Sequence, residues 1–103
     1  MRGTEREMDV ARRAQTIDWL KTEIVDQVAR LFRALWEGST VRLTDSLASL
    51  ISSSYILGRR LGLSYRELDD AVIAKLRKLS QEGHTLEVDY GDLSRLEDHI
   101  RKR

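Results

Sequence analysis

Apolar residues recur every three or four positions through most of the first 61 residues, and Gly38 interrupts the repeat. This spacing predicts two amphipathic helices, over about residues 4–36 and 40–61. Thr4 and Glu7 fit a capping box at the start of the first helix. The apolar stripes expected to form the core are Ile17, Leu20, Ile24, Val28, Leu31 and Leu35, then Leu43, Leu47, Leu50, Ile51, Leu57 and Leu61. Two such helices joined by a short turn form an antiparallel hairpin.

The second half of the chain repeats this pattern over shorter segments. Ser64 and Glu67 fit a capping box for a third helix, and the C-terminal residues carry a last amphipathic helix. The connection between them, residues 84–91, includes a segment at 86–88 that suits an extended conformation but is too short for a sheet. The pattern predicts an all-α fold, an antiparallel bundle of about four helices in a single domain over residues 1–103.

Composition agrees with packed helices and narrows the class of protein. Hydrophobic residues make up 41% of the chain and proline is absent, which suits helices better than a sandwich or a disordered tail. The lack of cysteine excludes disulfides and thiolate metal sites. No apolar run reaches the ~20 residues that span a bilayer, so we expect a cytoplasmic protein without a membrane partner. The net charge of +1 does not support nucleic-acid binding. A domain this small buries a modest share of its surface, so we expect a homo-oligomer, either a dimer or a tetramer.

A polar face on the first predicted helix holds the candidate chemistry. Glu23 and Asp26 are three residues apart, so their carboxylates emerge about one turn apart on one side and can offer two oxygen ligands to magnesium. The simpler interpretation is a solvated surface on which Asp26 pairs with Arg30 at i,i+4. Trp19 shares this face, where its indole either stacks on a nucleotide base or packs at a helix or subunit interface.

A stripe of serines marks the second predicted helix. Ser46, Ser49 and Ser53 recur at helical spacing, and Asp45 lies one turn before Ser49. Small hydroxyl side chains permit close helix approach, although serine has only moderate helix propensity. The stripe therefore indicates either a packing constraint or a polar pocket.

Two stretches of the sequence, WLKTEIVDQVARLFRALWEGS and LTDSLASLISSSYILGRRLGLSYRELDDAVIAKLRK, resemble the MazG-like branch of the all-α nucleoside triphosphate pyrophosphohydrolases. That family carries an E-x-x-E/D pair on a first long helix, an E-x-x-D pair on a second helix that ends in R-L-G, and a third helix. The resemblance covers about residues 16–80. It implies that four carboxylates bind magnesium, which holds a nucleoside triphosphate while water cleaves between the α- and β-phosphates and pyrophosphate is released.

The acidic motifs implied by the resemblance are half present. Glu23 and Asp26 correspond to the first acidic pair. Counting back from the R-L-G at residues 60–62 places Ser46 and Ser49 where the family has its second glutamate and aspartate. Hydroxyls replace carboxylates poorly, because they do not neutralise magnesium or the developing charge on phosphate.

Two hypotheses follow from the resemblance. In the first, Asp45 replaces a lost ligand, so that Glu23, Asp26 and Asp45 bind magnesium in a nucleotide pyrophosphohydrolase. Lys75 lies where the family has a phosphate-contacting lysine, which makes Glu23, Asp26 and Lys75 the candidate catalytic residues, with Trp19 against the base. In the second, the chain is a non-catalytic helical oligomer that binds a nucleotide or a protein partner.

Overall fold

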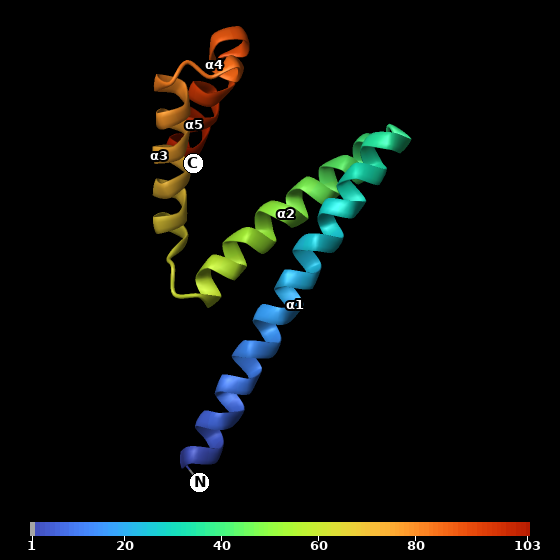
Figure 1. Cartoon of the computed structure of the whole chain (residues 1–103), viewed down its shortest axis with the longest axis vertical. Coiled ribbons are helices and arrows are strands. Elements are labelled where there is room, and N and C mark those ends of the chain that lie inside the picture. Colours follow the sequence, from blue (N-terminus) through green and yellow to red (C-terminus); the bar gives the residue numbers. More distant parts are fainter. Residues whose placement is uncertain (1) are drawn as a thin grey trace. The chain divides into compact units, whose positions relative to one another are not determined.

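The computed structural model describes the backbone of residues 2–103 and the side chains from Thr4 onward. Every element in this part of the chain is a helix, and the helices are α1 (Arg2–Glu37), α2 (Thr40–Arg60), α3 (Tyr65–Gln81), α4 (Thr85–Tyr90) and α5 (Asp92–Lys102) (Figure 1). The all-α prediction is confirmed, with five helices in place of about four. None of these helices combines the length and the apolar content that crossing a bilayer requires.

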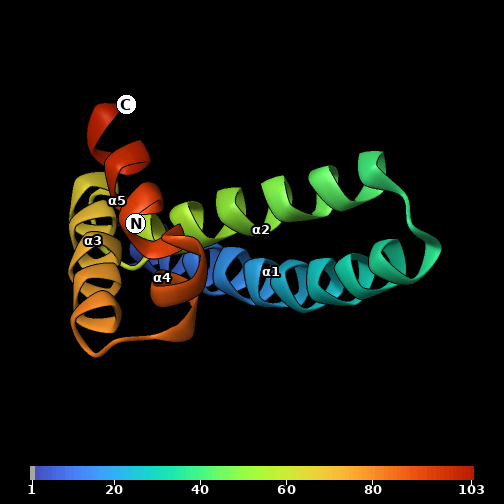
Figure 2. The ribbon, with the colours of Figure 1, turned by 90° about the horizontal axis from the view of Figure 1, so that it is seen from above.

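Contacts divide the chain into two compact units, Met1–Gly62 and Leu63–Arg103. In the first unit, α1 and α2 run side by side in opposite directions from a short turn, as the sequence predicts (Figure 2). Gly38 has a φ of 68° at this turn, a conformation that favours glycine. Ser39 caps α2, because its hydroxyl oxygen accepts a 3.3 Å hydrogen bond from the Arg42 N–H.

The interface between α1 and α2 has a narrow core. Leu20 and Ala34 of α1 are 1% and 2% exposed, and Ser46 of α2 is 3% exposed. The prediction that the apolar stripes form the core is wrong for part of each stripe, since Leu35 and Ile51 are both exposed. The apolar surface of each helix is wider than the area that one partner helix covers. The residues at the margin of each stripe therefore stay exposed.

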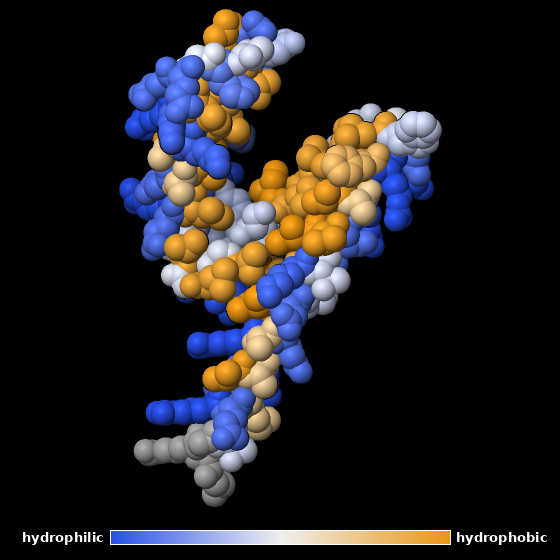
Figure 3. Space-filling model, in the orientation of Figure 1, coloured by the Kyte–Doolittle hydropathy of each residue, from blue (hydrophilic) through white to orange (hydrophobic). Residues whose placement is uncertain are grey.

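Four exposed members of the two stripes lie on one side of the hairpin, namely Val28, Leu35, Leu47 and Ile51. On a 3.6-residue wheel they are displaced by roughly 70–135° from the residues at the α1–α2 interface, and the two displacements point to the same side because the helices are antiparallel. Figure 3 shows apolar side chains gathered over α2 and the adjoining turns of α1. Phe32 was not a member of the predicted stripe but lies on the same side, so the apolar side consists of Val28, Phe32, Leu35, Leu47 and Ile51.

In the second unit, α3 and α5 pack against each other in opposite directions, with α4 between them in the chain (Figure 1). Leu76 of α3 and Leu93 of α5 are the buried apolar residues of this contact. At its edge, Glu97 of α5 forms a 3.1 Å ion pair with Arg77 of α3. The unit is therefore a small helical hairpin with one short extra helix.

The start of α3 agrees with the sequence prediction, whereas the start of α1 and the conformation of residues 86–88 do not. The Ser64 hydroxyl accepts a 3.0 Å hydrogen bond from the Glu67 N–H, which confirms the cap of α3. Thr4 is not a cap, because α1 already begins at Arg2. Residues 86–88 are not extended, because they belong to α4. The His84 ring caps this helix, since its Nδ1 accepts a 3.1 Å hydrogen bond from the Leu86 N–H.

Glu87 ties the short helix α4 to α5. One of its carboxylate oxygens accepts a 3.0 Å hydrogen bond from the Ser94 N–H, and the other accepts one from the Ser94 hydroxyl. Ser94 lies in the first turn of α5, whose N-cap, Gly91, has no side chain to bond a free N–H. These hydrogen bonds lower the pKa of the Glu87 carboxyl below its ordinary value of 4.5. A residue of α4 thus caps α5.

Candidate functional site

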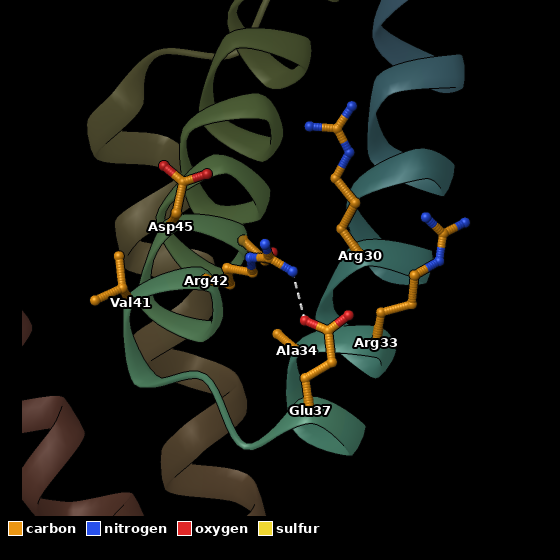
Figure 4. Close-up of a pocket in the computed structure, with 8 residues that line it drawn as sticks. Arg30, Arg33, Ala34, Glu37, Val41, Arg42 and Asp45 are labelled. Atoms are coloured by element: carbon orange, nitrogen blue, oxygen red, sulfur yellow. Dashed lines mark hydrogen bonds and ion pairs between the residues drawn. The ribbon is translucent and has the colours of Figure 1, made fainter.

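The turn at Gly38 places the end of α1 beside the start of α2, and a groove of about 580 Å³ lies between them (Figure 4). Its charged side chains come from both helices at helical spacing, so they project into the same space. The groove is lined by Arg30, Arg33, Ala34, Glu37, Val41, Arg42, Asp45 and Ser46. Arg30, Arg33 and Arg42 are called the groove arginines below.

The groove arginines differ in their partners. Arg42 reaches from α2 across the turn to Glu37, at 2.6 Å (Figure 4). The Arg30 Nε lies 2.9 Å from an Asp26 oxygen. Arg33 has no carboxylate partner among the side chains that the structure describes. An anion entering the groove therefore meets one free guanidinium and two that are held by exposed ion pairs, which are individually weak.

The first acidic pair lies where the sequence places it. Glu23 and Asp26 are one turn apart on α1 and both are half-buried. Asp26 is bound to Arg30, as the simpler interpretation of this face expected. Asp45 projects from α2 as an exposed side chain at the groove. Asp45 is thus the one member of the predicted site that lines the groove, and Asp26 is joined to the groove through its ion pair with Arg30.

Polar side chains also enter the α1–α2 interface. Gln27 is spaced seven residues from both Leu20 and Ala34, so it lies on the same buried side of α1, and it is 6% exposed. Its Oε1 accepts no hydrogen bond from the described part of the chain. Ser46 is buried across the same interface. The serine stripe thus supports close packing at Ser46, where the family motif has a carboxylate.

The donor set does not fit a magnesium site within one chain. Magnesium prefers near-octahedral oxygen coordination with charged ligands. From Thr4 to the C-terminus, no three acidic or histidine side chains gather in a way that could hold a metal. Asp26 is already engaged with Arg30, and the Ser46 hydroxyl carries no charge. The roles of Glu23, Asp26 and Asp45 as metal ligands stay predictions.

Trp19 does not line the groove, and Lys75 belongs to the other unit. Trp19 is 61% exposed and precedes Arg30 by about 16 Å along α1, at 1.5 Å per residue. It borders a different hollow, formed with Arg12, Gln15 and Thr16. Lys75 is exposed on α3, in the second unit. Their roles in base stacking and phosphate contact stay predictions.

Sequence reasoning missed two side chains of the groove. Glu37 and Arg42 stand on either side of the Gly38-Ser39 turn, and they close it with an ion pair. Opposite charges flanking a glycine turn were a readable signal for this pairing. Gln27 was missed as well, since a single glutamine beside an apolar stripe gives no sign that its amide will be buried.

Comparison with known proteins gives one family. The sequence profile of the MazG-like family matches residues 10–93, which include all of α2 and α3 and most of α1. No curated protein and no solved structure matches the chain significantly.

Proposed function

Because the chain belongs to the MazG-like family, a family related to nucleotide pyrophosphohydrolases, we propose that it binds the phosphate groups of a nucleoside triphosphate in the α1–α2 groove. The observation that carries this proposal is the set of groove arginines on two helices around one space of about 580 Å³. This volume lies within the range of small-molecule sites.

The chemistry of the groove arginines suits phosphate. A guanidinium is planar, always charged, and donates two parallel hydrogen bonds to the oxygens of one phosphate. Arg33 has a free guanidinium, and phosphate can compete for Arg42 because its ion pair with Glu37 is solvent-exposed. Glu37 and Asp45 limit the net positive charge, which favours a ligand that brings a cation with it.

Calorimetric titration of the full chain with ATP and dATP, with and without magnesium, tests this binding. We expect Arg33→Gln to weaken binding about tenfold or more, because a charge-assisted hydrogen bond contributes about 1.5–3 kcal/mol. Arg66→Gln, an exposed arginine of α3, is the matched control and should bind as the unaltered protein does. Equal affinity in the Arg33→Gln protein would contradict the proposal.

Hydrolysis is the second candidate function, and the placement of Glu23 and Asp26 one turn apart on α1 favours it. In this candidate the two carboxylates and Asp45 bind magnesium when a second copy or the ligand completes the coordination, and Lys75 contacts phosphate. We expect pyrophosphate release that requires magnesium or manganese and is lost in Glu23→Gln, with ATP binding retained. If nucleoside triphosphates bind but none of a broad panel is hydrolysed, the hydrolase candidate is refuted and the non-catalytic, nucleotide-binding alternative is supported.

We also propose that the protein is a cytoplasmic homo-oligomer in which the apolar side of the hairpin packs on a second copy. The two helices of one hairpin bury only a narrow core. Two hairpins related by a two-fold axis would form a four-helix bundle around a shared core. Phe32 is 64% exposed on this side, and Phe32→Glu should convert the oligomer to a monomer in light scattering. A monomeric mass for the unaltered protein would refute this assembly.

A further inference from the structure

A second pocket, separate from the groove, lies where the end of α2 meets the first half of α1. Its volume is about 570 Å³, and its lining includes Arg12 and Arg13 from α1 and Arg59 and Arg60 from α2. Asp9 is the single acidic residue among the lining side chains. Four guanidinium groups with one carboxylate make this pocket far more basic than the chain as a whole, which has a net charge of +1.

The four arginines of this pocket are not neutralised by the protein. Within the described side chains, none of them lies within ion-pair distance of a carboxylate, Asp9 included. Arg59 and Arg60 belong to the last turn of α2, where the helix dipole favours cations. The dipole does not account for Arg12 and Arg13, which lie within α1, far from its C-terminal end. An anion that enters the pocket would relieve the mutual repulsion of the four arginines.

An aromatic surface adjoins the basic pocket. Trp19 borders a hollow of about 330 Å³ that shares Arg12 and Thr16 with the arginine pocket. Trp19 and Arg12 are seven residues apart, so they lie on the same side of α1. The exposed indole can stack on a nucleobase, and the neighbouring guanidinium groups can bind phosphates.

We infer that Trp19 and the four arginines form a nucleoside oligophosphate site, with the phosphates among Arg12, Arg13, Arg59 and Arg60 and the base against Trp19. A compact oligophosphate matches four guanidinium groups around one open pocket of about 570 Å³ better than an extended polymer does. The site shares no residue with the α1–α2 groove, so the inference does not rest on the proposed function. This site accounts for the exposed Trp19 indole on the polar face of α1, away from the apolar side.

Trp19 is a direct reporter for this site. The chain has two tryptophans, and Trp36 is 92% exposed at the other end of the hairpin, so Trp36→Phe leaves Trp19 as the only indole. In magnesium-free buffer we expect ATP to quench the Trp19 emission of this protein and to raise its Tm, because a ligand stabilises the folded state that binds it. Inorganic tripolyphosphate should compete with ATP but leave the emission almost unchanged, because it has no base.

Charge-matched variants locate the site. In the Trp36→Phe background, the double variant Arg59→Gln/Arg60→Gln should bind ATP at least about tenfold more weakly, because two charge-assisted contacts are lost. Arg66→Gln with Arg95→Gln removes the same charge from two exposed arginines of the second unit, which have no carboxylate partner among the described side chains, and should not change the affinity for ATP. Circular dichroism confirms that each variant is folded. Arg33→Gln in the groove separates this site from the proposed function, because it should leave the Trp19 quenching intact.

Two outcomes would overturn the inference. One is ATP binding in which the two double variants weaken the affinity equally, because the attraction would then be a general charge effect. The other is that ATP binds no more tightly than tripolyphosphate and leaves the Trp19 emission unquenched. Trp19→Leu gives the complementary test by calorimetry. This variant should have a lower affinity for ATP and an unchanged affinity for tripolyphosphate.

Discussion

Replacing Gln27 with leucine should stabilise the protein. Gln27 is 6% exposed in the α1–α2 interface, and its Oε1 is buried without a hydrogen-bond donor. Leaving such a group unsatisfied costs about 1–3 kcal/mol, whereas a leucine of similar size has no polar atom to desolvate. Leucine and glutamine have nearly equal helix propensity, so the helix itself adds little. We therefore expect Gln27→Leu to raise the free energy of unfolding by about 1–2 kcal/mol.

Urea unfolding followed by circular dichroism measures this change. With an m value of about 2 kcal/mol/M for a chain of this size, the midpoint should rise by about 0.5–1 M. Gln15→Leu is the matched control, because Gln15 is exposed on the same helix, and it should change the free energy of unfolding by less than about 0.5 kcal/mol. A lower midpoint for Gln27→Leu would refute the reasoning, because it would mean that the amide makes a stabilising hydrogen bond in the folded protein.

Three further perturbations test other parts of the fold. Leu20→Ala should lower the free energy of unfolding by about 2–5 kcal/mol in urea titrations, because Leu20 is 1% exposed and its removal leaves a cavity; a loss below about 1 kcal/mol would contradict a packed α1–α2 core. Glu87→Gln should destabilise the protein at pH 7, and the difference from the unaltered chain should vanish in acid. The folded-state pKa of Glu87 is lowered, so its contribution is present above the ordinary value of 4.5 and is lost as the pH falls through the lowered pKa; a difference independent of pH would refute this. His84→Ala should cost about 1 kcal/mol of stability by removing the cap on the Leu86 N–H, and His84→Asn should restore it; equal stability of the two variants would argue against the cap.

The helix boundaries were largely readable because their determinants are local. Ser64 and Glu67 are three residues apart and form the expected cap, and Gly38 provides the turn with its positive φ. The helix at residues 85–90 was not readable, because Glu87 depends on Ser94, seven residues later and in another helix. A segment of six residues is too short for its own propensity to decide its conformation. The single domain over residues 1–103 stays a prediction.

Periodicity identified amphipathic helices but not which apolar residues are buried. Leu20 and Val28 are only roughly 80° apart on the wheel, yet Leu20 is buried and Val28 is exposed. The apolar surface of α1 is wide enough for two partners to pack on it. The sequence alone does not say which part of that surface α2 covers. Only the packing of α2 decides this.

The candidate site was predictable where it depended on one helix and not where it joined two. The spacing of Glu23 and Asp26 fixed their common side on α1, and the Asp26–Arg30 pair followed from i,i+4 spacing. The groove is formed by α1 and α2 together. The position of Arg42 in it, paired with Glu37 across the turn, is therefore evident only from the structure. The same holds for the arginine pocket, whose members are separated by more than 40 residues in the sequence.

The unequal lengths of α1 and α2 give one continuous helix two kinds of motion. α1 has 36 residues and α2 has 21, and the end of α2 reaches the part of α1 between Asp9 and Thr16. Amide hydrogens from Leu20 to Ala34 should exchange with solvent only when the hairpin opens. Those of residues 6–8 lie before the part of α1 that the end of α2 reaches, so they should exchange through local fraying, orders of magnitude faster. Mass-spectrometric exchange should therefore show protection that rises along α1 without any break in the helix.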